Sequence, residues 1–350
     1  MKVLITGITG MAGSHLAEYL LGQSNWELHG TLRWRSNRDN IAAFEKGLHL
    51  HECELRDPYA VMRLMKEIRP LRIYHLASQS NVAASWNSPR ETLVNNITAQ
   101  LNIFEAIRQL ELLDTRIHVA GSSEEYGLVY KHELPVKETN PLRPLSPYAV
   151  SKVTQDTLAY QYHKSYGLHV VRTRAFNHTG PRRGDVFVTS SFARQIVEIE
   201  MGKREPVIRV GNLKAKRDFT DIRDVVKAYV IALERCEAGS VFNIGSGKSY
   251  SIKHVLDLLL GMSRLIIQVK EDPEKMRPSD VPVMVSDSSR FMQETGWRPQ
   301  IPFKQSLLDL LQYWREKLGV QHTVFVNAQT AGLDNGLSRS EQFSTCRVGR

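Results

Sequence analysis

Residues 2–13 read KVLITGITGMAG, a short, largely apolar run that ends in a glycine-rich turn. A helical pattern follows over 14–22, so this stretch predicts a strand, a turn and a helix in that order. Gly7, Gly10 and Gly13 have the spacing G-x-x-G-x-x-G, which lets the backbone approach a pyrophosphate at the helix N-terminus. Glycines are common in any turn, but their place between a strand and a helix makes the pattern specific for a dinucleotide site.

The same alternation continues over residues 1–175. Strands are expected at 26–32, 48–55, 72–77, 116–120 and 169–175, and helices at 58–68, 95–110 and from 147 onward. This order predicts an α/β fold of the Rossmann type, a doubly wound parallel sheet with right-handed crossovers. Ligands of such sheets bind at the carboxyl ends of the strands.

The regular alternation weakens after residue 175. Helices are expected at 188–201, 252–260 and 303–318, one more helix should end near Leu233, and short strands are expected at 207–210 and 240–244. We interpret 176–318 mainly as a smaller, discontinuous α/β substrate lobe, with some segments returning to the first domain. The cleft between the two should then take the substrate. Residues 319–350, rich in Gln, Asn, Ser, Thr and Gly, are expected to be a disordered tail.

The composition excludes several classes of protein. Of 350 residues, 42% are hydrophobic and 24% charged, as in soluble globular proteins, and no apolar run approaches the roughly 20 residues that span a bilayer. The three cysteines, Cys53, Cys236 and Cys346, have neither metal-ligand spacing nor a disulfide pattern. Because a strand is expected so close to the first residue, we expect no signal peptide. The cysteine pattern leads us to expect no metal site and a reducing cytoplasm. The net charge of +9 is scattered over the chain, so we expect an anionic nucleotide ligand and no nucleic acid.

The loop after the second expected strand indicates which dinucleotide binds. A protein that binds NAD usually carries an acidic residue here for the ribose 2′-hydroxyl. This chain has instead Arg33, Arg35 and Ser36, and no Asp or Glu between 31 and 36. Because guanidinium groups match a phosphate, the loop favours NADP, although a solvated basic loop would look the same.

The chemistry is expected at SPYAVSK, residues 146–152. Tyr148 and Lys152 are four residues apart, so on a helix that begins at Ser146 and Pro147 they share one face. A free tyrosine with a pKa near 10 is a poor base at neutral pH, and a nearby ammonium should lower that pKa. A chance pair on a solvated helix is the alternative. This alternative is disfavoured by Ser122 and Glu124, which belong to GSSEEYG at 121–127. They follow an expected strand, at the same edge of the sheet as the glycine turn. Two further segments should reach the adenine and the nicotinamide side respectively: Glu54-Leu55 and Leu76-Ala77-Ser78-Gln79-Ser80.

The glycine turn together with Y-x-x-x-K resembles the extended short-chain dehydrogenase/reductase superfamily, over roughly residues 1–318. Within it, GITGMAGSHLAEYLL, HG-x-x-R-x-R-S and FNH-x-x-PRRGDVFVT resemble the GDP-mannose 4,6-dehydratases. The segments GSSEEYG, FNHTGP, RDFTDIRD and MRPSDVP are at least as similar to the GDP-4-keto-6-deoxy-mannose reductases.

This resemblance implies roles for particular residues. Tyr148 would be the acid/base at the sugar 4-hydroxyl, Lys152 would tune it and hold the nicotinamide ribose, and Ser122 would share the hydrogen bond. Glu124 would remove the C5 proton in a dehydratase, and Glu125 would be structural. Further NADP contacts are implied for Gly7, Thr9, Gly10, Met11, Ala12, Gly13, Arg33, Arg35, Ser36, Glu54, Leu55, Leu76 to Ser80, His178 and Arg183, and GDP-sugar contacts for Asn177, Val188, Asn212, Arg217 and Arg277. Without the resemblance, Arg217 and Arg277 could equally form surface salt bridges.

The sequence also departs from the dehydratase pattern. Met11-Ala12 replaces Gln-Asp and Ser122 replaces Thr, whereas Thr179-Gly180 for Glu-Ser and Phe219 for Trp are reductase-like. We favour a dehydratase that makes GDP-4-keto-6-deoxy-mannose, on the strength of Glu124, the arginine loop and PRRGDVFVT. The alternative is an NADPH-dependent reductase of the 4-keto sugar. An inactive binding protein and a 4-epimerase are weaker interpretations. A homodimer or homotetramer is implied by the resemblance alone.

Overall fold

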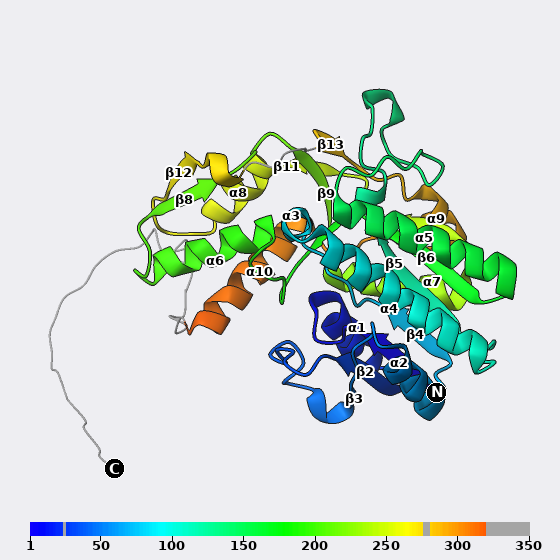
Figure 1. The fold of residues 1–350 in the computed structure, drawn as a ribbon. Coiled ribbons are helices and arrows are strands. Elements are labelled where there is room, and N and C mark those ends of the chain that lie inside the picture. Colours follow the sequence, from blue (N-terminus) through cyan, green and yellow to red (C-terminus); the bar gives the residue numbers. More distant parts are fainter. Residues whose placement is uncertain (24–25, 276–280, 320–350) are drawn as a thin grey trace, which may run out of the picture.

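A seven-stranded parallel sheet forms the centre of the molecule (Figure 1). The computed structural model describes residues 1–23, 26–275 and 281–319. The strand order β10-β6-β5-β4-β1-β2-β3 confirms the predicted doubly wound sheet. Its strands are β1 (Lys2–Thr6), β2 (Glu27–Leu32), β3 (His49–Glu52), β4 (Arg72–His75), β5 (Arg116–Ser122), β6 (His169–Ala175) and β10 (Val241–Ile244).

Helices cover both faces of this sheet because its strands alternate their side chains between two cores. In β1, Val3 and Ile5 belong to one core and Leu4 to the other. The first core is shared with α1 (Met11–Leu21), α7 (Ile222–Arg235) and α9 (Ser289–Thr295). The second is shared with α2 (Pro58–Ile68), α4 (Pro89–Gln109) and α5 (Pro147–Tyr166).

A smaller lobe stands beside the carboxyl edge of the sheet (Figure 1). In it, β9 (Lys216–Asp221) pairs with β7 (Asn177–Thr179), β11 (Ser249–Ser251) and β13 (Val283–Met284), and β8 (Val207–Val210) pairs with β12 (Gln268–Glu271). Its helices are α6 (Val188–Glu200), α8 (Ile252–Leu260) and α10 (Phe303–Leu318), which share a separate core around Leu256, Leu307 and Trp314. Because β10, α7 and α9 lie on the large sheet, the chain returns to that sheet after residue 176. The boundary at 175/176 stays a prediction, and the predicted tail, apart from Gly319, lies outside the described residues.

Several predicted elements differ from the structure at their ends. The helices at 58–68, 252–260 and 303–318 and the strand at 207–210 coincide with α2, α8, α10 and β8. The helix predicted at 95–110 begins earlier, at Pro89, since proline is well suited to a first helical position. The strand predicted at 48–55 ends at Glu52, where the chain turns with a hydrogen bond from Asp57 N–H to the Glu54 carbonyl at 2.9 Å. Helix α3 (Val82–Asn87) and the strands β7, β9, β11, β12 and β13 had no clear pattern in the sequence, and the same holds for the one-turn helices η1 (Glu45–Gly47), η2 (Ser123–Glu125), η3 (Lys131–Glu133) and η4 (Pro273–Lys275). No helix in the described part of the chain is both long and apolar enough to cross a membrane.

Two buried histidines predict that acid weakens this fold. His75 and His118 are 3% and 0% exposed, and each ring has a threonine hydroxyl about 3 Å away, at 3.0 and 2.9 Å respectively. Burial lowers the pKa of both imidazoles from 6.5 to about 3. The folded protein therefore keeps them neutral while the unfolded chain takes up protons, so their contribution is complete above pH 6.5 and is lost as the pH falls toward 3. At pH 5.5 the loss is about 1.4 kcal/mol for each histidine.

From these two histidines we expect urea unfolding at pH 5.5 to show a free energy of unfolding about 3 kcal/mol below that at pH 7.5. The variant His75→Gln, which removes one of the two groups, should narrow the difference by about 1.4 kcal/mol. The matched control is the exposed His132, whose change to Gln should leave the difference as it is. Equal stability of the wild type at both pH values would contradict the prediction.

Candidate active site

A large cleft opens at the carboxyl edge of the sheet, where the smaller lobe faces it. Its volume is about 1160 Å³, which is large enough for two nucleotide-sized ligands. Nearly all of the residues predicted for the site line it. They are Gly7, Thr9, Gly10, Met11, Ala12, Gly13, Arg33, Ser36, Glu54, Leu55, Leu76, Ala77, Ser78, Gln79, Ser80, Ser122, Glu124, Tyr148, Lys152, Asn177, His178, Arg183, Val188, Asn212 and Arg217.

One predicted residue, Arg35, does not line the cleft, and another lies outside the residues that the structure describes. Arg35 is absent from its lining, and its guanidinium lies 4.3 Å from the ring centre of the exposed Trp34. The Arg35 guanidinium thus has an exposed indole as its partner, whereas Arg33 lines the cleft. Arg277 lies outside the described residues.

The glycine turn packs too closely to accept side chains. Gly7 has a φ of +68°, and a Cβ on it would lie 2.9 Å from Ala77 Cα. A Cβ on Gly13 would lie 2.3 Å from the Gly7 carbonyl oxygen. The N-cap of α1 is Gly10, without a side-chain hydrogen bond, so the N–H groups of the first turn are free of a side-chain cap. Since Met11, Ala12 and Gly13 line the cleft, this helix end fits a diphosphate.

The far end of the cleft is built from the ends of β2 and β3. The Arg33 N–H donates to Ser36 Oγ at 3.0 Å, which folds the loop after β2. The carboxylate of Glu54 accepts from Arg56 Nε and Nη2 at 3.0 and 2.9 Å, and both side chains line the cleft. Asn40 also lines it, and its amide donates to the Thr9 carbonyl at 2.9 Å. Arg56 and Asn40 were not predicted, because neither belongs to a pattern that differs from an ordinary polar loop.

Tyr148 and Lys152 lie on the buried face of α5, close to Ser122 at the end of β5. The helix begins as predicted, with Ser146 Oγ accepting from the Ala149 N–H at 3.1 Å and Pro147 in the first turn. The Lys152 ammonium lies 5.9 Å from the centre of the Tyr148 ring and donates to the Ala120 carbonyl at 2.8 Å. Burial lowers the pKa of Lys152 to about 8, which the Glu125 carboxylate partly opposes.

The structure corrects the expectation that Lys152 lowers the pKa of Tyr148. Burial raises the pKa of this phenol above its ordinary range; a hydrogen bond with Ser122 and the charge of Arg183 oppose the rise, and the charge of Glu124 adds to it. Because the Lys152 ammonium is bonded to Ala120, its charge is directed at the end of β5. In this structure Tyr148 is therefore a protonated group that can donate to a substrate oxygen.

Glu124 brings a carboxylate to the same part of the cleft. Its backbone N–H donates to Ser122 Oγ at 3.2 Å, which fixes the turn η2. Its side chain lines the cleft, and none of the residues that the structure describes forms a hydrogen bond or an ion pair with that carboxylate. The cleft thus contains a hydroxyl, a phenol, an ammonium and an available carboxylate together, a set suited to proton transfer.

The lobe side of the cleft contributes further polar groups. His178 is buried with Nδ1 3.2 Å from the Phe176 carbonyl, and burial lowers its pKa to about 3. The Arg183 guanidinium lies 3.5 Å from the Phe187 ring centre, and burial lowers its pKa to about 10. Arg217 donates to the Val281 carbonyl at 2.6 Å. Among the lining residues that were not predicted are Arg182, Arg209 and Tyr229. Tyr229 lies within an apolar helix pattern typical of core positions, so the sequence held no signal for it.

Within residues 1–23, 26–275 and 281–319, no group of three or more His, Cys, Asp or Glu side chains is arranged to hold an ion.

Comparison with known proteins gives consistent matches. The family model described as GDP-mannose 4,6 dehydratase matches residues 4–310. A GDP-6-deoxy-D-mannose reductase of Pseudomonas aeruginosa is 31% identical over 318 residues, which are 91% of this chain and 98% of that protein. A GDP-mannose 4,6-dehydratase of Vibrio cholerae is 34% identical over 347 residues, with 88% and 92% covered.

Solved structures agree on the fold. RMD from Pseudomonas aeruginosa, complexed with NADPH, has a TM-score of 0.78 at 30% identity and covers 90% of this chain and 99% of its own. The UDP-glucose 4-epimerase of Thermus thermophilus, complexed with NAD, has a TM-score of 0.81 at 29% identity, with 90% and 99% covered.

Proposed function

The chain belongs to the GDP-mannose 4,6-dehydratase family, and from this membership we propose that it removes water from GDP-mannose to give GDP-4-keto-6-deoxy-mannose. It is thereby an enzyme of the nucleotide-sugar dehydratase and reductase group. The observation that carries the finer proposal is Glu124, a carboxylate in the cleft beside Ser122 and Tyr148 that no described residue engages. Reduction of a ketone needs no such base, whereas dehydration does.

We propose NADP as the cofactor. The capless N-terminus of α1 and the tight glycine turn support a bound diphosphate, and Arg33 with Ser36 supports a ribose 2′-phosphate. A solved relative of 30% identity is complexed with NADPH. When bound, this cofactor accepts a hydride from sugar C4 and gives it back at C6.

The residues of the chain would handle the protons. Tyr148 would first lose its own proton to solvent, and the resulting phenolate would take the proton of the 4-hydroxyl as C4 becomes a ketone, with Ser122 Oγ sharing the hydrogen bond. The ketone acidifies the C5–H bond, so the Glu124 carboxylate would remove that proton and pass it to the hydroxyl that leaves C6 as water. Tyr148 would then give the proton that it took from the 4-hydroxyl to C5, which completes the product and restores the phenolate. Since the hydride is also returned, one turnover changes neither the cofactor nor the enzyme.

Reduction of the GDP-4-keto-6-deoxy sugar is the second candidate. In its favour, the match to the Pseudomonas aeruginosa reductase spans 98% of that protein. Phe219, which is reductase-like, lines the cleft and stacks on Phe303 with ring centres 5.1 Å apart. This reaction would use the same Ser122, Tyr148 and Lys152 but would consume NADPH. A homodimer or homotetramer and a cytoplasmic location stay predictions for either activity.

A mass spectrum of GDP-mannose after incubation with the purified protein and trace NADP separates the two candidates. We expect a product lighter by one water, with no net change in NADPH. Unchanged GDP-mannose, together with NADPH consumption on the preformed 4-keto sugar, would overturn the dehydratase proposal in favour of the reductase.

The two arginines of the loop after β2 give a test of the cofactor proposal. Arg33→Ala removes a cation that lines the cleft, so NADP should bind about 10- to 100-fold more weakly, the range of one or two charge-assisted hydrogen bonds. Arg35→Ala is the matched control, because this side chain stacks on Trp34 outside the cleft, and its effect should stay below about threefold. Titration of each variant with NADP and NAD measures this. Equal losses for both nucleotides in Arg33→Ala would contradict a 2′-phosphate contact.

A further inference from the structure

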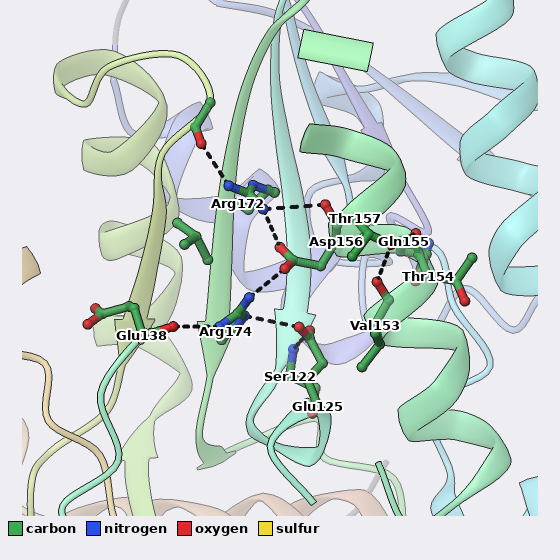
Figure 2. Close-up of polar contacts among 12 residues, drawn as sticks. Ser122, Glu125, Glu138, Val153, Thr154, Gln155, Asp156, Thr157, Arg172 and Arg174 are labelled. Atoms are coloured by element: carbon green, nitrogen blue, oxygen red, sulfur yellow. Dashed lines mark hydrogen bonds and ion pairs between the residues drawn. The ribbon is translucent and has the colours of Figure 1, made fainter. Parts of the chain in front are cut away.

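A buried charge cluster of four ionisable side chains joins the end of β5 to α5 and β6 (Figure 2), and none of the four lines the cleft. Its members are Glu125, Asp156, Arg172 and Arg174, which are 0%, 3%, 8% and 5% exposed. They come from three places: η2, the middle of α5, and alternate positions of β6. Two acidic groups thus face two guanidinium groups in the interior, where burial, followed by the charge of Asp156, raises the pKa of Glu125 to about 8.

The contacts within this charge cluster are short, and those that Asp156 accepts are hydrogen bonds. Arg174 Nη2 donates to Asp156 Oδ2 at 2.6 Å, and Arg172 Nη1 donates to Asp156 Oδ1 at 3.2 Å. Arg174 Nε lies 3.1 Å from Glu125 Oε2. The other oxygen of Glu125 accepts from the backbone N–H of Ser122 at 2.7 Å (Figure 2). The cluster therefore ends on the backbone of Ser122, which lines the cleft together with Tyr148.

The same cluster holds the helix that carries Tyr148 and Lys152. Asp156 follows these residues by eight and four positions, so the three side chains share one buried face of α5. By binding Arg172 and Arg174, Asp156 fixes this face against β6. Glu125 joins the end of β5 to the same Arg174. The strand end that carries Ser122 and the helix that carries Tyr148 are therefore both held by one guanidinium.

The approach of these elements leaves no spare room. A Cβ on Gly121 would lie 2.5 Å from Glu125 Oε1 and 2.7 Å from the Thr173 carbonyl oxygen. Apolar side chains could fill such a space with similar or greater stability, but they could not accept the Ser122 N–H. The Glu125 carboxylate therefore provides a hydrogen-bond acceptor for the Ser122 N–H, which apolar packing could not provide.

We propose that Glu125 and Asp156 are positioning residues, which set the register of Ser122 against Tyr148 and Lys152 through Arg174. The proposal rests on the proposed catalytic group, but it applies equally to dehydration and to reduction. Its test is made on whichever of these two reactions the wild type catalyses, so a failure of the dehydratase proposal leaves it testable.

The deciding variant is Glu125→Leu combined with Arg174→Met. It removes one acidic and one basic group together, and Asp156 keeps Arg172 as its partner. The Tyr126 hydroxyl and the Glu138 carbonyl also lose Arg174, so the melting temperature is measured beside kcat. The Ser122 N–H loses its acceptor, and we expect kcat to fall on the order of 100-fold while KM and the affinity for NADPH stay within about threefold. If the double variant is as stable as the wild type and has the same kcat, the proposal is overturned. A variant whose kcat is unchanged but whose KM rises would also overturn it.

A second variant covers poor folding of the first. Glu125→Gln is nearly isosteric and keeps an oxygen for the Ser122 N–H, so kcat should fall less than about tenfold. A loss of 100-fold or more here, in a protein that still binds NADPH, would overturn the role given to the hydrogen bond. The matched control is Glu200→Gln, which breaks the half-buried pair with Arg315 that joins α6 to α10. It should lower the melting temperature and leave kcat unchanged.

Discussion

Replacing Tyr148 by phenylalanine is expected to lower kcat on the order of 10³-fold, with little change in the affinity for the GDP-sugar or NADP. The ring is 8% exposed, so most of its packing survives the loss of one oxygen. What is lost is the group that exchanges a proton with the sugar 4-oxygen. Ser122, the other catalytic hydroxyl, lines the same cleft, and it opposes the rise in the pKa of this phenol.

Steady-state rates on both candidate reactions, with binding measured separately, check this effect. Tyr160 offers the matched control, because it lies on the same helix but is 47% exposed, and Tyr160→Phe should leave kcat unchanged. A rate within tenfold of the wild type in Tyr148→Phe would mean that another group carries the proton.

Much of this site could be predicted because its parts are local in sequence. The glycine turn is read from 12 consecutive residues, 2–13, and the strand order then brings Ser122 to the same edge as Gly7. The i, i+4 spacing of Tyr148 and Lys152 needs only a helix, whose start was marked by Ser146 and Pro147. Each of these predictions depends on short-range stereochemistry, which the sequence specifies directly.

The features that the sequence does not predict depend on contacts between residues far apart in the chain. Arg172 and Arg174 alternate within HVVRTRA, a pattern typical of a strand with one solvated face, yet both are buried. Only the tertiary structure supplies Asp156 and Glu125 as their counter-charges. The rise in the pKa of Tyr148 has the same origin, since burial is its largest cause and exposure cannot be read from a spacing. Arg35 was placed in the cleft because its loop was basic, and its stacking on Trp34 was not foreseen.

The choice between the two reactions depends on one carboxylate. Ser122, Tyr148 and Lys152 serve hydride chemistry at C4 in either direction, so their presence does not separate a dehydratase from a reductase. Glu124 differs, because a base at C5 is needed only when a hydroxyl is to leave C6. Its carboxylate has no hydrogen-bond or ion-pair partner among the residues that the structure describes, so it is available as a base.

Glu124→Gln should therefore lower the rate of water loss from GDP-mannose on the order of 10³-fold, since an amide cannot take the C5 proton. Oxidation at C4 needs only Ser122, Tyr148 and NADP, so in a single turnover with stoichiometric enzyme the reduced cofactor should accumulate and persist. This accumulation distinguishes a blocked elimination from a damaged site. Glu294→Gln, an exposed change on α9 beside Arg290, is the control and should leave both steps unchanged. If the variant still releases a product lighter by one water at near the wild-type rate, Glu124 is not the base. If the wild type only consumes NADPH on the 4-keto sugar and Glu124→Gln does so equally well, the cleft is that of a reductase, in which this carboxylate has no chemical step to perform.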